Sequence, residues 1–169
     1  DKYDENVEIL GSKKNIILQG APGVEKSFIA KRLAYSLLKQ KDDSKIEFVQ
    51  FHQSYSYEDF VVGYKPTETG FKIEYGPFYK FCKKAETTDG LSFFIIDEIH
   101  RGNLSRIFGE LLMLIEATNR HQKATLLIPQ MAFHVPAHHF FIVLMITTNT
   151  KLALLALALL RRLYLFVSE

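Results

Sequence analysis

The stretch that decides the fold reads Gly20-Ala-Pro-Gly-Val-Glu-Lys-Ser27. It follows an aliphatic run, Asn15 to Gln19, and precedes a segment whose apolar residues have helical spacing, Phe28 to Lys39. A loop between a strand and a helix presents successive backbone N–H groups, and the positive end of the helix, to a phosphate group. Lys26 suits the β- and γ-phosphates of a nucleotide, and the Ser27 hydroxyl suits Mg²⁺. The sequence therefore predicts a phosphate-binding loop made of Gly20, Ala21, Pro22, Gly23, Val24, Glu25, Lys26 and Ser27.

Glu25 departs from the pattern G-x-x-x-x-G-K-[ST], which has glycine at this position. Two like unit charges about 5 Å apart repel by roughly 3 kcal/mol at an effective dielectric constant near 20. Lys26 and Mg²⁺ offset part of that repulsion, and a Glu25 side chain turned outward would reduce it further. A side chain also restricts the close backbone approach that glycine permits. Glu25 therefore predicts weakened nucleotide binding.

A second informative stretch is an apolar run, Leu91 to Ile96, that ends in Asp97 and Glu98. Carboxylates at the end of a buried strand are costly unless they meet a cation or water. In a phosphate-loop protein the first carboxylate holds Mg²⁺ and the second polarises the attacking water. We therefore expect Ser27 and Asp97 to hold the metal and Glu98 to be catalytic.

Short apolar strands alternate with helices along the chain, which predicts an α/β domain with a mostly parallel, five-stranded sheet. Ligands of such sheets bind at the carboxyl ends of the strands. The phosphate-binding loop, Asp97–Glu98 and Thr147–Asn149 all follow strands, so we expect them to converge on one site. The expected strands are 15–19, 46–51, 91–97, 140–146 and 163–167, and the main helices are 28–39, 77–86, 103–117 and 151–162.

Other segments carry weaker signals. We expect residues 1–14 to be a polar lead-in with about one turn of helix, and residues 15–169 to be one nucleotide-binding domain. The aromatic stretch 52–60 is typical of a strand exit with a short helix capped by Ser56, and a loop that touches a ligand or partner is the alternative. Residues 67–76 resemble a hairpin, and a second hairpin is expected within 125–136. His138 and His139 are expected on a strand, pointing to opposite faces, and no zinc-type spacing is present.

Composition sets broad limits on function. The chain has 169 residues, a formal net charge of +2 and the single cysteine Cys82. Near-neutral charge without a basic stripe gives little support for direct DNA binding, and one cysteine fits a reducing compartment. The first residues are polar and acidic, unlike a signal peptide. The apolar segment 139–160 is interrupted by Thr147 to Lys151, so we expect no membrane span and a cytoplasmic protein.

Residues 15–135 resemble the motor domain of the McrB family, the AAA+ GTPases of 5-methylcytosine-specific restriction systems. The family-specific stretch runs from Val49 to Phe60, and the phosphate-binding loop and Asp97–Glu98 are shared with many NTPases. Further matching residues are Ile99, Arg101, Asn103–Ser105, Phe108–Glu110, Phe133 and Val135–Pro136.

The resemblance implies a three-layer AAA+ sandwich that binds GTP, or alternatively ATP, with Mg²⁺. It also implies self-association into a ring and a McrC-like nuclease partner. Hydrolysis in such systems drives translocation on DNA, so contact with DNA would be indirect. Methylated-base recognition belongs to a separate domain in this family.

Several positions depart from the family pattern. The family's Met-Asn-x-x-Asp signature appears as Met145-Ile-Thr-Thr-Asn149, and we favour Asn149 as the sensor residue. The acidic residue expected in the next helix is Ala156. Arg161 and Arg162 are expected either to act on a neighbour's γ-phosphate or to cap the helix C-terminus. The sequence ends at Glu169, so we expect the helical lid of such modules to be absent and the isolated chain to turn over poorly. A degenerate module that serves as an assembly or regulatory subunit is the alternative.

Overall fold

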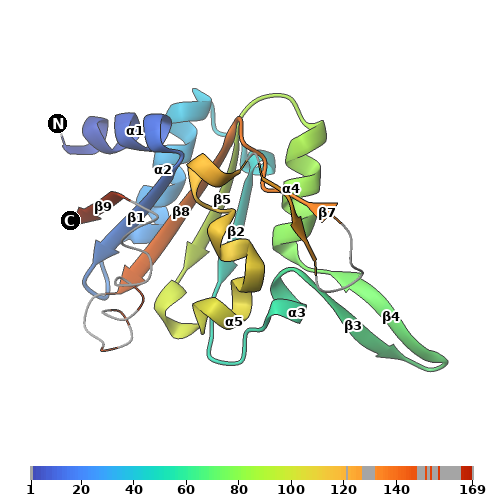
Figure 1. Cartoon of the computed structure of the whole chain (residues 1–169). Coiled ribbons are helices and arrows are strands. Elements are labelled where there is room, and N and C mark those ends of the chain that lie inside the picture. The colour runs from blue at the N-terminus through green and yellow to red at the C-terminus, as the bar shows by residue number, and fades with distance from the viewer. Residues whose placement is uncertain are drawn as a thin grey trace.

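Five strands form one parallel sheet at the centre of the fold (Figure 1). The computed structural model describes residues 2–120, 122–126, 132–147, 151, 153, 156 and 165–168. In sheet order the strands are β2 (Ile46–Gln50), β5 (Ser92–Asp97), β8 (Phe140–Thr147), β1 (Asn15–Gly20) and β9 (Leu165–Ser168). Every neighbouring pair runs parallel. The mostly parallel five-stranded sheet predicted from the sequence is confirmed.

Helices cover both faces of this sheet and produce three layers. One face packs against α1 (Lys2–Lys13) and α2 (Lys26–Leu38), and the other against α3 (Tyr57–Phe60), α4 (Pro77–Thr87) and α5 (Leu104–Phe108). Strand side chains alternate between the two cores, since Phe93 joins the first and Phe94 the second. Both faces of β1, β5 and β8 are buried, which explains why these three strands are largely apolar, whereas the edge strand β2 is partly exposed and carries Glu47 and Gln50.

The segment before β1 is more ordered than its polar composition indicates. Residues 1–14 were expected to contain about one turn of helix, and that expectation is wrong because α1 runs from Lys2 to Lys13. Leu10 is fully buried against the sheet, and the Tyr3 hydroxyl lies 2.8 Å from Ser36 Oγ on α2. Packing against α2 stabilises a helix whose own apolar pattern is sparse.

The helix expected over 103–117 is also wrong in its length. α5 ends at Phe108, and the chain continues as a 3₁₀ helix, η3 (Gly109–Met113). Gly109 has φ 52°, which interrupts the α-helix. The Tyr57 ring lies against this glycine, where a Cβ would be 3.3 Å from it, and the Tyr57 hydroxyl donates to Glu110 at 2.7 Å. A tertiary contact therefore sets the end of α5.

An antiparallel hairpin, β3 (Val62–Thr67) and β4 (Gly70–Tyr75), projects from the body of the molecule (Figure 1). Its base is tightly packed, because a Cβ on Gly76 would lie 2.3 Å from the Phe60 carbonyl carbon. The Phe71 side chain near the tip is 75% exposed. The hairpin or extended excursion expected over 67–76 is a hairpin, but its first strand begins earlier, at Val62. The short helix α3 with its Ser56 cap is confirmed.

The second, shorter hairpin joins β6 (Ala124–Thr125) to β7 (Ala132–Phe133). The next segment corrects one expectation: His139 precedes β8, with φ 61°, and does not lie on a strand.

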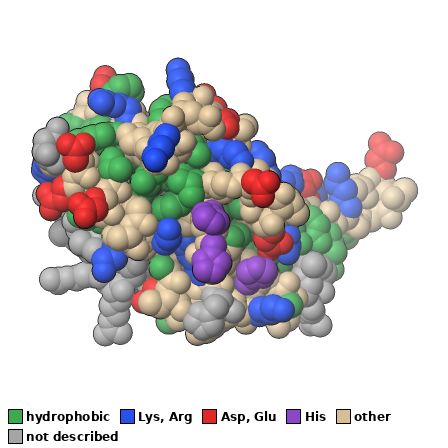
Figure 2. Space-filling model, turned by 90° about the horizontal axis from the view of Figure 1, so that it is seen from above, with side chains coloured by type: hydrophobic (Ala, Val, Ile, Leu, Met, Phe, Trp, Pro, Cys, Tyr) green, Lys and Arg blue, Asp and Glu red, His purple; other side chains and the backbone are tan. Residues whose placement is uncertain are grey.

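Figure 2 views the end of the sheet where the strands begin, with histidine side chains gathered near its centre and charges of both signs interspersed. Among the described residues, no helix is long and apolar enough to cross a membrane.

Candidate functional site

The loop between β1 and α2 is held largely by its own atoms. Lys26 begins α2, and its Nζ donates to the carbonyl oxygens of Gly20 at 3.3 Å and Ala21 at 2.9 Å. The side chain is buried among loop atoms, so the ammonium group lies against the backbone of the loop that carries it. Gly23 has φ 88°, a conformation that favours glycine. The residues of the phosphate-binding loop motif therefore explain how this side of the site is held in place.

Glu25 has a backbone conformation that any residue can adopt. It is the N-cap of α2, with φ −73° and ψ 54°, and its carbonyl accepts from Ile29 N–H at 3.0 Å. Its side chain is exposed and makes no cap hydrogen bond within the described part of the chain. The conformation of Glu25 therefore does not require glycine, and the effect of its side chain and charge on the approach of a phosphate stays a prediction.

Asp97 and Glu98 lie where β5 ends, next to the ends of β2 and β8. Asp97 Oδ1 accepts from the Glu98 N–H at 2.8 Å. Partial burial raises the pKa of the Asp97 carboxyl, and that hydrogen bond opposes the rise. Glu98 itself has φ 51°, a left-handed conformation uncommon for a residue with a side chain. The chain therefore turns sharply at Glu98 and directs its side chain across the end of the sheet.

The carboxylate of Glu98 is engaged on both oxygens. Thr147 Oγ1, at the end of β8, donates to Oε1 at 2.6 Å. Arg101 Nε, in the 3₁₀ helix η2 (Ile99–Arg101), lies 2.7 Å from Oε2. Burial alone would raise the pKa of Glu98, but the Thr147 hydrogen bond and the neighbouring His100 and Arg101 together lower that pKa. Glu98 is thus held as a carboxylate by groups from two separate elements.

His100 lies behind this pair and is almost completely buried. Its Nε2 is 3.5 Å from Glu98 Oε2, and its Nδ1 has no hydrogen-bond partner within the described part of the chain. Burial lowers the pKa of the His100 imidazole, and the nearby Glu98 charge opposes that change. A neutral imidazole therefore fits this position.

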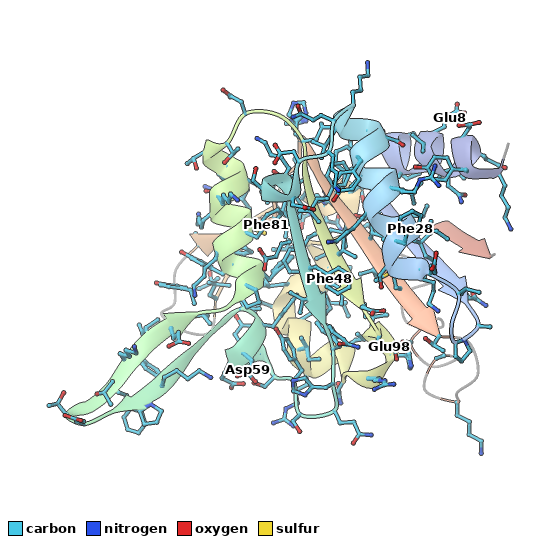
Figure 3. The ribbon with its side chains drawn as sticks, turned by 180° about the vertical axis from the view of Figure 1, so that it is seen from behind. Glu8, Phe28, Phe48, Asp59, Phe81 and Glu98 are labelled. Carbon is cyan, nitrogen blue, oxygen red and sulfur yellow. The ribbon has the colours of Figure 1, made fainter. Side chains whose placement is uncertain are left out.

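These elements surround one cavity of about 850 Å³ at the carboxyl end of the sheet, where Figure 3 shows Glu98. Its lining comes from the phosphate-binding loop (Pro22–Ser27), the exit of β2 (His52–Ser54), Asp97, Glu98, His100, Arg101 and Thr147. The structure thus brings together Lys26, Ser27, Asp97 and Glu98, as the sequence analysis expected. Asn149, Arg161 and Arg162 lie outside the described residues. Ala156 is described and is buried.

Sequence reasoning did not assign a site role to Arg101 or His100. It expected Thr147 at the site, which the structure confirms, since Thr147 pairs in register with Gly20, the first residue of the phosphate-binding loop. Arg101 is three residues after Glu98, but only the sharp turn at Glu98 brings the two side chains together. The wall made by His52–Ser54 agrees with the alternative reading of the aromatic stretch, a loop beside a ligand site.

Comparison with known proteins shows related sequences and folds. Residues 15–163 match the family model described as the AAA domain of the dynein-related subfamily. The McrB subunit of the type IV methyl-directed restriction enzyme of Escherichia coli K12 is 47% identical over 156 residues, which is 89% of this chain and 34% of the relative. The chain thus spans about a third of that relative's length. The resemblance to the McrB family is confirmed by this identity.

A similar fold occurs in the crystal structure of a protein from Cytophaga hutchinsonii to which an ATPase function has been attributed. The TM-score is 0.56 at 16% identity, over 99% of this chain and 44% of the other. At that identity the likeness shows the fold alone, and it agrees with the three-layer arrangement described above.

Proposed function

Because this chain belongs to the dynein-related subfamily of AAA domains, we propose that its cavity binds a purine nucleoside triphosphate with Mg²⁺ and hydrolyses it. One observation carries the proposal: Lys26, Ser27, Asp97 and Glu98, which come from two distant stretches, line the same cavity. The proposed nucleotide is GTP, on the strength of the McrB similarity, and ATP is the alternative.

Each residue has a proposed role that follows from its chemistry. Lys26 binds the β- and γ-phosphates after its ammonium leaves the Gly20 and Ala21 carbonyls. Backbone N–H groups of the loop and the N-terminus of α2 bind the remaining phosphate oxygens. Ser27 and Asp97 supply hard oxygen donors, which fit Mg²⁺. When bound, Mg²⁺ neutralises charge on the phosphate oxygens.

Glu98 is the proposed catalytic residue, because it accepts a proton from, and orients, the attacking water. Its lowered pKa keeps the carboxylate ionised at neutral pH. We keep Asn149 as a proposed sensor and Arg161 and Arg162 as proposed fingers that act on a neighbouring copy. Ring formation, a McrC-like nuclease partner and an indirect action on DNA are proposed from the McrB similarity alone.

A second candidate is a degenerate module that binds nucleotide weakly or not at all and serves in assembly or regulation. One observation favours it: Glu25 is among the residues that line the cavity proposed for the phosphates. Its exposure to solvent weakens the repulsion, because water screens the charge.

Titration with fluorescent GTP and ATP analogues, with Mg²⁺ and with EDTA, tests both candidates. The first predicts Mg²⁺-dependent binding by the wild-type chain and its loss in Lys26→Ala, with Lys31→Ala on the outer face of α2 as the matched control. If the wild-type chain binds neither nucleotide at millimolar concentration while Glu25→Gly does, the degenerate module is the correct reading. If neither protein binds, the first candidate is wrong and only a module that does not bind nucleotide remains.

A further inference from the structure

The position of the Glu98 carboxylate is not fixed by strand pairing. β5 ends at Asp97, so the Glu98 backbone lies beyond the sheet ladder. Its left-handed conformation, φ 51°, persists only where the surroundings determine it, because such a conformation is unfavourable for a residue with a side chain. The contacts of the side chain must therefore set where this carboxylate points.

Two short contacts, made by residues of different elements, set where the Glu98 carboxylate points. The Thr147 hydroxyl holds Oε1 from β8, and the Arg101 guanidinium holds Oε2 from η2. One anchor leaves a carboxylate free to rotate about the anchored oxygen, whereas two anchors on different oxygens fix its plane. His100 lies 3.5 Å from Oε2, which is too long to replace the Arg101 contact.

The Arg101 contact is short, yet it contributes little to folding. The Arg101 side chain is 58% exposed, and an ion pair at such a surface contributes little to stability. Its geometric effect is larger than its energetic effect, because a displacement of about 1 Å in a catalytic group can slow a reaction by roughly 10²-fold. A short ion pair to Glu98 from a residue that lines the same cavity is therefore suited to positioning the Glu98 carboxylate.

We propose that Arg101 is a positioning residue that fixes the plane of the Glu98 carboxylate for attack of water on the nucleotide. The inference rests on the proposed function, since it assigns the water to Glu98. In this proposal Arg101 acts on the reaction through Glu98. The contact is made within a single copy of the chain, so it requires no neighbour to form.

The first test compares turnover with binding in Arg101→Ala. We expect kcat to fall by about tenfold to a hundredfold, with nucleotide affinity unchanged. Arg101→Lys should recover part of kcat, since lysine restores a cation beside Oε2. Arg106→Ala is the matched control, because Arg106 is an exposed arginine on α5 outside the cavity lining. An unchanged or increased kcat in Arg101→Ala overturns the proposal.

The second test does not need turnover. High-resolution crystal structures of the wild type and Arg101→Ala should show Glu98 in one orientation in the first and in a rotated or multiple orientation in the second, with the Thr147 contact kept. An unchanged Glu98 in Arg101→Ala refutes the positioning role even if the wild type hydrolyses nothing. Absent turnover with a rotated Glu98 would instead overturn the proposed hydrolysis and leave the positioning of Glu98 by Arg101 standing.

Discussion

The two walls of the cavity are built in opposite ways. In the phosphate-binding loop, the charged group of Lys26 contacts the carbonyls of its own loop, and Glu25 extends into solvent. Across the cavity, Glu98 is held by Thr147 from a neighbouring strand and by Arg101 from the following 3₁₀ helix. The first wall is local in sequence and the second depends on how strands are ordered in the sheet. Substitutions should therefore affect binding at the first wall and chemistry at the second.

The largest effect is expected from Glu98→Gln. The amide keeps the shape of the side chain but cannot accept the proton, so kcat should fall by about 10²–10⁴-fold. Nucleotide affinity should change little, which single-turnover kinetics with parallel binding titrations will measure. If Glu98→Gln retains the wild-type kcat, hydrolysis does not depend on the Glu98 side of the cavity.

The second-largest effect is expected from Lys26→Ala, and it should appear in nucleotide affinity rather than in kcat. Loss of a charge-assisted hydrogen bond of about 1.5–3 kcal/mol weakens nucleotide binding by roughly 10–100-fold. Isothermal titration calorimetry is the measurement, and Lys31→Ala should match the wild type. Equal affinity in Lys26→Ala and Lys31→Ala would place the phosphates elsewhere.

Thr147→Val sharpens the comparison, because it removes one anchor of Glu98 and keeps the volume of the side chain. We expect kcat to fall by about tenfold, since a hydrogen bond to a carboxylate is lost, while affinity stays constant. Thr67→Val on the projecting hairpin is the control and should have no effect on kcat. If nucleotide affinity falls instead, Thr147 contributes to nucleotide binding rather than to the positioning of Glu98.

The smallest effect is expected from Glu25→Gly. The charge of an exposed carboxylate is screened by water and salt, and its backbone conformation does not require glycine. Affinity should rise by only about two- to fivefold, and more at low ionic strength than at high, as titrations at several salt concentrations will show. A gain of roughly a hundredfold would mean that this carboxylate points into the phosphate site.

The features that could be predicted from the sequence are those set by residues close together in the chain. The features set by tertiary contacts could not be predicted. Asn15–Gly20 and Ser92–Asp97 could be placed from apolar runs, and Lys26, Ser27, Asp97 and Glu98 from motif chemistry. The end of α5 could not, because the Tyr57 ring packs at Gly109 from a distant part of the chain. α1 was missed for the same reason, since its stability comes from α2. The Glu98–Arg101 contact depends on the left-handed backbone conformation of Glu98, which no local sequence pattern predicts.

The projecting hairpin has a mechanical consequence. A Cβ at Gly76 would lie 2.3 Å from backbone atoms of Phe60, and one at Gly63 would lie 2.5 Å from Glu58 Cβ. The Gly76 N–H also donates to the Val61 carbonyl at 2.7 Å. The base of the hairpin is therefore closely packed against α3, and Figure 3 shows Asp59 beside it. A movement of this base must move α3 with it, and α3 follows soon after the segment that forms one wall of the cavity.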